Sequence, residues 1–380
     1  MWTKNSFLGL FTFIGAIVGA GVFGLPFVIA KAGIVPSIFY MIGLSLVALL
    51  LQLMFGEINL RTKENHRLPG FSEKYLGKHH KKIISVATIT GLIGGLLAYI
   101  IVSGDFLSII ISAFSNYSFS PTTLSLVFAA FLSFFIYKGI ETISEAETII
   151  NIGFFIIIFL LFGATFTDVQ LSNFEMVNMD NIFLPYGVIL YAFMGWSSIP
   201  ALASLLKTKK EKKSLKTIMI VGILLIMVLY LFFAFSIVGV SGTGTTEEAL
   251  KGLTNLVDPK VIALGALFGI FAFASSFLVV GNYLKNILVY DFSVPHFLAF
   301  LIACGVPIVL FLSGFRRFID VVGIVGTVLG VVEGTAIIFI FKNAKELGNR
   351  KPEYSLNVPN FILYSIIVIF VLGALSQVLN

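Results

Sequence analysis

Long apolar stretches separated by short polar segments run along the whole chain. About eleven of them are long enough to cross a bilayer as helices, because about 20 apolar residues span a hydrocarbon core of ~30 Å. We place these spans near residues 6–31, 35–58, 83–113, 122–138, 143–166, 182–205, 217–240, 260–290, 295–313, 318–341 and 358–379. The polar tract 241–259 is predicted to be a loop that carries a short helix. The pattern predicts an all-α polytopic membrane protein with a single domain over residues 1–380.

The composition agrees with lipid as the solvent of this chain. Hydrophobic residues make up 58% of the 380 residues, charged residues only 12%, and the mean hydropathy is +1.02. A soluble domain carries about 25% charged residues, so this chain could not hide its apolar surface from water. The single cysteine, Cys304, excludes an intrachain disulfide and a cysteine-based zinc site.

The basic residues predict the orientation in the membrane. If the N-terminus is cytoplasmic, 20 of the 25 Lys and Arg residues fall on the cytoplasmic side, mostly in segments 61–82, 207–216 and 342–351. The net charge of +6 then reflects topology and anionic lipid headgroups, and it does not imply a nucleic-acid partner. We expect an integral protein of a prokaryotic cell (inner) membrane with its C-terminus outside.

A glycine motif in the first span looks like a nucleotide site but lacks the necessary context. Gly19, Gly21 and Gly24 have the spacing G-x-G-x-x-G. A dinucleotide loop follows a short strand and is followed by an acid about 20 residues later. Here a long apolar run precedes the glycines, and the first acid downstream is Glu57. The motif is therefore not interpreted as a nucleotide site.

The same glycines predict an interrupted helix. Glycines this close together, followed by Pro26, weaken a helix near the middle of the membrane. Irregular backbone is tolerated at that depth only where it is buried in protein or lines a cavity. The freed amides would lie at the positive end of the outer half-helix, where an anion such as a carboxylate is attracted; they belong to Gly19, Ala20, Gly21 and Val22.

A second G-x4-P motif predicts an inverted repeat. Gly195 and Pro200 each follow their counterparts Gly21 and Pro26 by 174 positions, in a span that runs in the opposite direction. A weaker echo links Gly-Asp-Phe-Leu at 104–107 to Gly-Asn-Tyr-Leu at 281–284. These pairs predict one repeat over about 6–166, a second over about 182–341, interruptions in helices 1 and 6, and an extra eleventh helix over about 358–379.

Several landmarks together resemble a known transporter family. They are GAIVGAGVFGLPFVIAKAG, Glu57 in FGEINL, Tyr99 in LLAYIIVSGD, the YAFMGWSSIPAL run, SSFLVV, and PHFLAF followed by FIDVVGIVG. In order and spacing they resemble the amino-acid/polyamine/organocation transporters, and most closely the hydroxy and aromatic amino-acid permease branch (amino acid/auxin permeases). Trp196 stands where many aromatic permeases have a histidine, so the resemblance leaves the particular substrate open.

The resemblance implies a LeuT-type core of five plus five helices and an ion-coupled symporter that works by alternating access. Its expected substrate is a neutral apolar or aromatic amino acid, with no cofactor and no enzymatic activity; the oligomeric state stays open. The substrate carboxylate would meet the amides of Ala20 and Gly21. Its ammonium would meet the freed carbonyls of Ile17, Tyr191 and Ala192. Phe193 and Trp196 would form aromatic walls around its side chain, and Tyr99 would contact it from helix 3.

The coupling ion is left open between sodium and a proton. Ser275 and Ser276 resemble the hydroxyl pair that ligates Na⁺ in sodium-coupled relatives, and the carbonyls of Gly15, Val18 and Ala272 would complete that candidate site. The lysine that replaces the ion in some proton-coupled relatives is missing from the fifth span. The proton alternative assigns coupling to Asp105 or Glu333, which lie in apolar helices where acids are costly.

Two other functional classes stay open at this point. A non-transporting amino-acid sensor on the same fold would usually carry an added cytoplasmic domain, for which this chain has little room. An intramembrane protease would need Ser241 and His296 together, but the predicted topology places them on opposite sides of the membrane.

At the cytoplasmic end of the second span, Glu57 and Arg61 are spaced to form an ion pair.

Overall fold

The computed structural model describes residues 2–64, 66–115, 117–138, 153, 156–160, 162–254 and 256–379. In these ranges the chain is helical, and seven helices are long and apolar enough to cross a membrane. The bent pair α1–α2 makes an eighth span, and three shorter apolar helices correspond to the predicted fifth, ninth and eleventh spans. Most of the fifth predicted span, 143–166, lies outside the described residues.

The helices follow the predicted order, and ten of the eleven predicted spans lie within the described residues. Their bounds are α1 Lys4–Ile17, α2 Gly21–Ala32, α3 Ile34–Arg61, α4 Leu68–Leu76, α5 Lys78–Phe114, α6 Pro121–Lys138, α8 Pro185–Phe193, α9 Ile199–Leu205, α10 Lys209–Ser241, α11 Pro259–Asn286, α12 His296–Phe300, α13 Val306–Leu312, α14 Phe318–Leu329, α15 Thr335–Leu347 and α16 Asn360–Leu379. Short π-helical segments join α12 to α13 and α14 to α15, so each pair forms one continuous span. The 241–259 loop carries two short 3-10 turns, as predicted.

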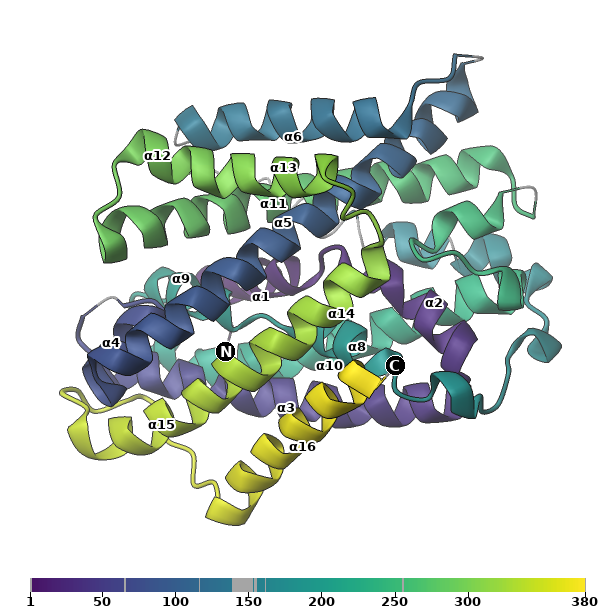
Figure 1. Ribbon diagram of the computed structural model, residues 1–380. Helices are drawn as coiled ribbons and strands as arrows, with labels where there is room; N and C mark the ends of the chain where they lie inside the picture. Colours follow the sequence, from purple (N-terminus) through teal and green to yellow (C-terminus); the bar gives the residue numbers. More distant parts are fainter. Residues whose placement is uncertain are drawn as a thin grey trace.

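The helices form two packed groups. In the first, α5 packs against α4, α6, α11 and α13, and Figure 1 shows α6, α11, α12 and α13 together while α5 crosses them obliquely. In the second group, α10 packs against α1, α2 and α3, and α8 packs against α2 and α3. The α14 helix contacts both α8 and α5 and so joins the groups.

Both predicted interruptions are present in the structure. The α1 helix ends at Ile17, the α2 helix begins at Gly21, and their axes bend by 54°. The α8 helix ends at Phe193, and a 3-10 turn at Trp196–Ser198 precedes α9. Pro200 lies in the first turn of α9, where its missing amide proton costs no helical hydrogen bond. The sequence therefore located both breaks to within a few residues.

Helix ends differ from prediction where polar residues extend a helix beyond its apolar run. The α10 helix begins at Lys209, eight residues before the predicted 217, because Thr208 and Glu211 form a capping box. The α4 helix was not predicted, because its nine residues are too few to cross a membrane and include the polar run Ser-Glu-Lys. The predictions from hydropathy were accurate where a helix lies in lipid and wrong where it continues into polar surroundings.

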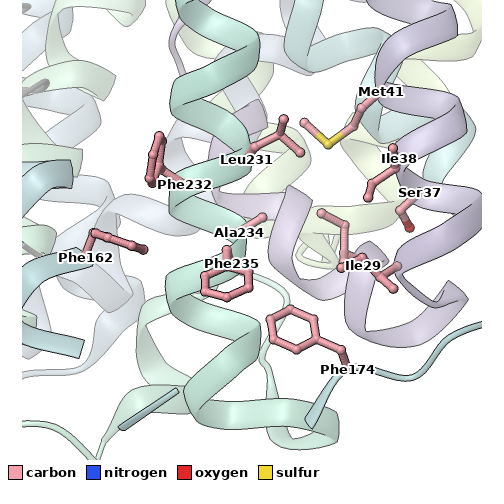
Figure 2. A pocket seen from close by; sticks show the side chains of 11 residues that line it. Ile29, Ser37, Ile38, Met41, Phe162, Phe174, Leu231, Phe232, Ala234 and Phe235 are labelled. Carbon is pink, nitrogen blue, oxygen red and sulfur yellow. The ribbon is translucent and has the colours of Figure 1, made fainter. Parts of the chain in front are cut away.

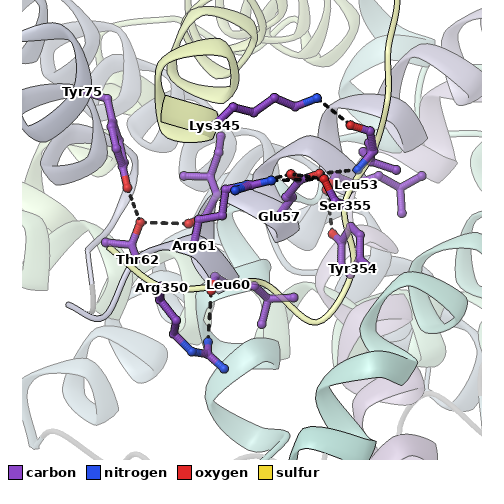
Figure 3. Close-up of polar contacts among 12 residues, drawn as sticks. Leu53, Glu57, Leu60, Arg61, Thr62, Tyr75, Lys345, Arg350, Tyr354 and Ser355 are labelled. Atoms are coloured by element: carbon purple, nitrogen blue, oxygen red, sulfur yellow. Dashed lines mark hydrogen bonds and ion pairs between the residues drawn. The ribbon is translucent and has the colours of Figure 1, made fainter. Parts of the chain in front are cut away.

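A buried carboxylate fastens the segment before α16 to α3. Glu57 is fully buried and pairs with Arg61, with 2.7 Å between Oε1 and Nε, which confirms the expected ion pair. It also accepts hydrogen bonds from Ser355 Oγ at 3.0 Å and from the Leu356 amide at 2.6 Å (Figure 3). The Tyr354 hydroxyl adds a bond to the Leu53 carbonyl. Glu57 thus holds together two segments almost 300 residues apart in sequence.

Glycines allow α14 to lie directly on α8. A Cβ atom on Gly326 would lie 2.9 Å from the Tyr191 backbone nitrogen, and one on Gly187 would meet the Gly323 carbonyl. Small residues permit this backbone approach between membrane helices. Gly43, in the middle of α3, has no atom within 4 Å of its Cβ position.

Gly326→Ala is therefore expected to destabilise the fold, because backbone atoms of α8 cannot move aside for a methyl group. We expect a loss of about 1–3 kcal/mol, seen as a lower thermal unfolding midpoint in detergent. Gly43→Ala serves as the control and should leave the midpoint unchanged or slightly higher, because Ala is the better helix former. Equal midpoints for the two variants would contradict the close packing of α14 on α8.

Candidate functional site

The interruption of the first span presents four unpaired amides. Gly19, Ala20, Gly21 and Val22 are buried, and in the described part of the chain none of their amides donates a hydrogen bond. They stand at the N-terminal, positive end of α2, which has twelve residues. Buried amides without partners are costly, and an anion at this end would satisfy them. This geometry fits the carboxylate predicted from the glycines.

Hydroxyl groups from three other helices surround the same interruption. A Cβ on Gly19 would lie 2.8 Å from the Tyr99 hydroxyl oxygen of α5 and 3.4 Å from Ser276 Oγ of α11. The Tyr191 hydroxyl of α8 interacts with that of Tyr99. Ser276 lies close enough to Tyr99 to interact electrostatically, but it makes no hydrogen bond of normal geometry. Residues of α5, α8 and α11, which belong to the third, sixth and eighth predicted spans, thus meet at the interruption between α1 and α2.

The interruption of the sixth span exposes carbonyl groups, and two polar side chains bind them. Gln52 of α3 donates to the Phe193 carbonyl at 3.0 Å, and the Tyr230 hydroxyl of α10 donates to the Ala192 carbonyl at 3.0 Å. The sequence pattern did not single out either residue as part of the site. The available signal was a lone polar or amphipathic residue inside an otherwise apolar run, in VALLLQLMFG and in IMVLYLFFAF.

Aromatic rings pack around the two interruptions. Phe23, in the outer half-helix, makes edge contacts with Phe106, Phe233 and Phe273 at centroid distances of 4.9–5.4 Å. Phe273 also stacks on Tyr99, with centroids 6.1 Å apart. Phe193 is fully buried, with its ring 5.3 Å from that of Tyr230. These rings exclude water from the polar groups of the interruptions, which strengthens electrostatic interactions there.

Glu333 has two hydrogen-bond donors, one of which is Trp196. The indole N–H of Trp196 donates to Glu333 Oε2 at 2.5 Å, and Thr88 Oγ1 donates to Oε1. Glu333 is 5% exposed and lies in the π-helical segment between α14 and α15, a kind of distortion common at functional sites. These residues line a cavity of about 50 Å³ beside the second interruption. Trp196 therefore points its polar atom at Glu333, a contact that the sequence did not suggest.

Asp105 does not lie deep in the protein, contrary to our expectation. Its side chain is 26% exposed and pairs with Lys251 of the 241–259 loop at 3.5 Å. The 37-residue α5 is longer than a bilayer core requires, so Asp105 lies near one end. Burial raises the pKa of the Glu248 carboxyl in the same loop, and the charge of Asp105 adds to the rise. Asp105 belongs to a loop contact rather than to the centre of the bundle.

The candidate sodium ligands lie on adjoining helices. Gly15 and Val18 are at the end of α1, which packs against α11. On α11, Ala272 and Ser276 are buried one turn apart on the same face, and Ser275 is half-buried. Ser276 Oγ is buried beside the Tyr99 hydroxyl and has no hydrogen-bond partner of normal geometry in the described chain.

Two other cavities do not fit an amino acid. One of about 310 Å³ is lined by side chains of α2, α3, α10 and the 162–174 segment, which are apolar or aromatic, such as Met41, Phe174 and Phe235, apart from Ser37 (Figure 2). It lacks the opposite charges that a zwitterion requires. Another lies at the basic end of the bundle, where Arg61 and Arg350 are already paired with Glu57 and Glu353.

The residues of the protease alternative have other partners. The Ser241 hydroxyl bonds to the Ile237 carbonyl and to Thr245 at the end of α10. His296 is the first residue of α12. No nucleophile–base pair involving Ser241 occurs in the described ranges.

Comparisons with known proteins agree with this geometry. The crystal structure of MhsT in complex with L-phenylalanine matches with a TM-score of 0.74 at 14% sequence identity, covering 98% of each chain. The fold is therefore the LeuT-type arrangement of five plus five helices with an additional eleventh helix. No curated protein matches this chain. The model of the tryptophan/tyrosine permease family matches residues 3–377, which is nearly the whole length. The chain is thus an integral membrane protein with a transporter fold, and it belongs to the tryptophan/tyrosine permease family.

Proposed function

We propose that this permease is a sodium-coupled symporter of neutral aromatic or apolar amino acids that works by alternating access. The observation that carries the proposal is the set of four buried, unpaired amides at the positive end of α2. The carbonyls of Ile17 and Ala192, at the negative ends of α1 and α8, both lie within 3.5 Å of the Tyr230 hydroxyl, and a Cβ atom on Gly21 would lie 2.7 Å from the Ala192 Cα. A zwitterion places a carboxylate and an ammonium on one carbon, so it satisfies both ends at once.

The site residues follow from this pose. The amides of Ala20 and Gly21, flanked by Gly19 and Val22, receive the carboxylate. The ammonium binds at the carbonyls of Ile17, Tyr191 and Ala192, and Tyr99 contacts the substrate from α5. Phe193 and Trp196 border the side chain, and the bond of Trp196 to Glu333 supports the position of its ring.

We further propose that the basic end of the bundle faces the cytoplasm of a prokaryotic cell. The N-terminus and segments 61–82, 207–216 and 342–351 then lie inside, and the C-terminus lies outside. The two repeats are proposed to cover about 6–166 and 182–341, with 358–379 peripheral to them.

Sodium is favoured as the coupling ion by the buried Ser276 hydroxyl, which has no hydrogen-bond partner of normal geometry in the described chain. Oxygen ligands from Ser275, Ser276 and the carbonyls of Gly15, Val18 and Ala272 suit a small hard cation. The second candidate is a proton carried by Glu333, favoured by the burial of this acid in a distorted helix. Asp105 is the weaker proton candidate, because it is paired at the surface.

Uptake into proteoliposomes tests the substrate class. With an inward sodium gradient, labelled L-tryptophan, L-tyrosine or L-phenylalanine is expected to accumulate, because the site offers opposite charges and aromatic walls. Excess unlabelled neutral amino acids should compete. Accumulation of a sugar or a nucleobase without amino-acid competition would contradict the proposal.

Ser276→Ala tests the sodium site. The variant loses one hydroxyl oxygen and keeps the helix, so half-saturation by sodium should need about tenfold more ion, or ~1.4 kcal/mol. Substrate affinity should fall with it, because two ligands that favour one state are coupled reciprocally. Ser236→Ala is the control, since among the described residues that hydroxyl bonds only the Phe232 carbonyl of its own helix. Full uptake with sodium replaced by choline would refute the assignment.

Glu333→Gln separates the proton alternative from the sodium proposal. If sodium drives transport, the variant should keep sodium-driven accumulation with the wild-type pH profile. A lower rate is expected, because the amide nitrogen faces one of two donors. Glu353→Gln, at the ion pair with Arg350, is the control. Loss of gradient-driven uptake with exchange retained would assign coupling to a proton on Glu333.

A further inference from the structure

The Tyr230 side chain lies between the two interrupted spans. It is fully buried, and its hydroxyl donates to the Ala192 carbonyl at 3.0 Å while lying 3.5 Å from the Ile17 carbonyl oxygen. The ring of Phe193, 5.3 Å away, packs against the Tyr230 ring. One side chain of α10 therefore contacts both half-helices that end at the site.

The two carbonyl groups have the same electrostatic character. Ile17 is the last residue of α1, and Ala192 is the penultimate residue of α8. Both helices present their negative dipole ends here, and neither carbonyl accepts a bond from the residue four positions later. Buried oxygens of this kind repel each other and require a donor between them.

A hydroxyl supplies only one proton for these two acceptors. The shorter distance assigns that proton to Ala192, whereas 3.5 Å is at the outer limit of a hydrogen bond. The Ile17 oxygen is thus held close to Tyr230 and keeps its capacity to accept another donor. Because the hydroxyl carries no charge, it leaves the negative potential of both helix ends available to a cation.

We propose that Tyr230 is a positioning residue for the ammonium group of the substrate. Its hydroxyl satisfies Ala192 and fixes the separation of the two helix ends, so that the Ile17 carbonyl accepts the ammonium. This inference rests on the proposed function, and it identifies Tyr230 as the residue that organises the part of the site that binds the ammonium. The carboxylate half, at the amides of α2, does not involve Tyr230.

A comparison of two ligands separates this role from simple packing. L-Tryptophan and indole-3-propionate share an indole ring and a carboxylate, and only the first carries an ammonium. The full-length wild-type chain, Tyr230→Phe and Tyr186→Phe are purified, and inhibition constants of both compounds are measured against labelled L-tryptophan. Tyr186→Phe is the matched control, because the buried Tyr186 hydroxyl has no hydrogen-bond partner in the described chain.

In Tyr230→Phe, we expect the inhibition constant of L-tryptophan to rise about tenfold, and that of indole-3-propionate to change less than about twofold. Tyr186→Phe should leave both constants unchanged. The ratio of the two constants does not depend on the fraction of folded protein, so partial misfolding of a variant cannot produce the expected result.

Equal weakening of both ligands by Tyr230→Phe would overturn the inference and assign Tyr230 to packing. Unchanged binding of both ligands would overturn it as well. Failure of the wild-type chain to bind L-tryptophan or any other neutral aromatic or apolar amino acid would instead overturn the proposed function, and the role of Tyr230 with it. That failure is distinguishable, because it occurs before any residue is replaced.

Discussion

Unpaired backbone groups inside a membrane protein are the constraint on which the rest of this structure depends. In hydrocarbon, each such group costs several kcal/mol unless a partner satisfies it. The chain interrupts two of its helices in the interior and so creates amides at Gly19–Val22 and carbonyls at Ile17, Ala192 and Phe193. Uninterrupted helices then surround the breaks and supply partners for some of these groups.

The hydrogen-bond partners of these backbone groups are distributed unequally between the two interruptions. This unequal distribution leaves one end of the site with unpaired amides and the other with paired carbonyls. Gln52 and Tyr230 bind carbonyls at the second interruption, and Ser198 binds the Gly195 carbonyl. The four amides of the first interruption receive no such help from the described chain. A fold that satisfied every group would be a stable helical bundle with nothing to bind. We propose that the unsatisfied end is where a ligand contributes binding energy.

The sequence predicted those parts of the structure that follow from backbone chemistry. The G-x4-P motifs located both interruptions because Gly and Pro act on the chain locally, wherever they occur. It did not predict Gln52 and Tyr230 as partners, or the bond between Trp196 and Glu333, because side-chain contacts across helices leave no periodic signal. It also misjudged Asp105, since hydropathy alone does not reveal how far a long helix extends beyond the membrane.

The length of α5 has a mechanical consequence. Its 37 residues extend over about 55 Å, and along this one rod lie Thr88, Tyr99 and Asp105. Thr88 contacts Glu333 near one end, Asp105 contacts Lys251 near the other, and Tyr99 meets the interruption between them. A rigid rod that pivots near its middle moves its ends in opposite directions. Rocking of α5 about Tyr99 would therefore displace Thr88 and Asp105 in opposite directions, so it would change the Glu333 contact and the Lys251 contact together.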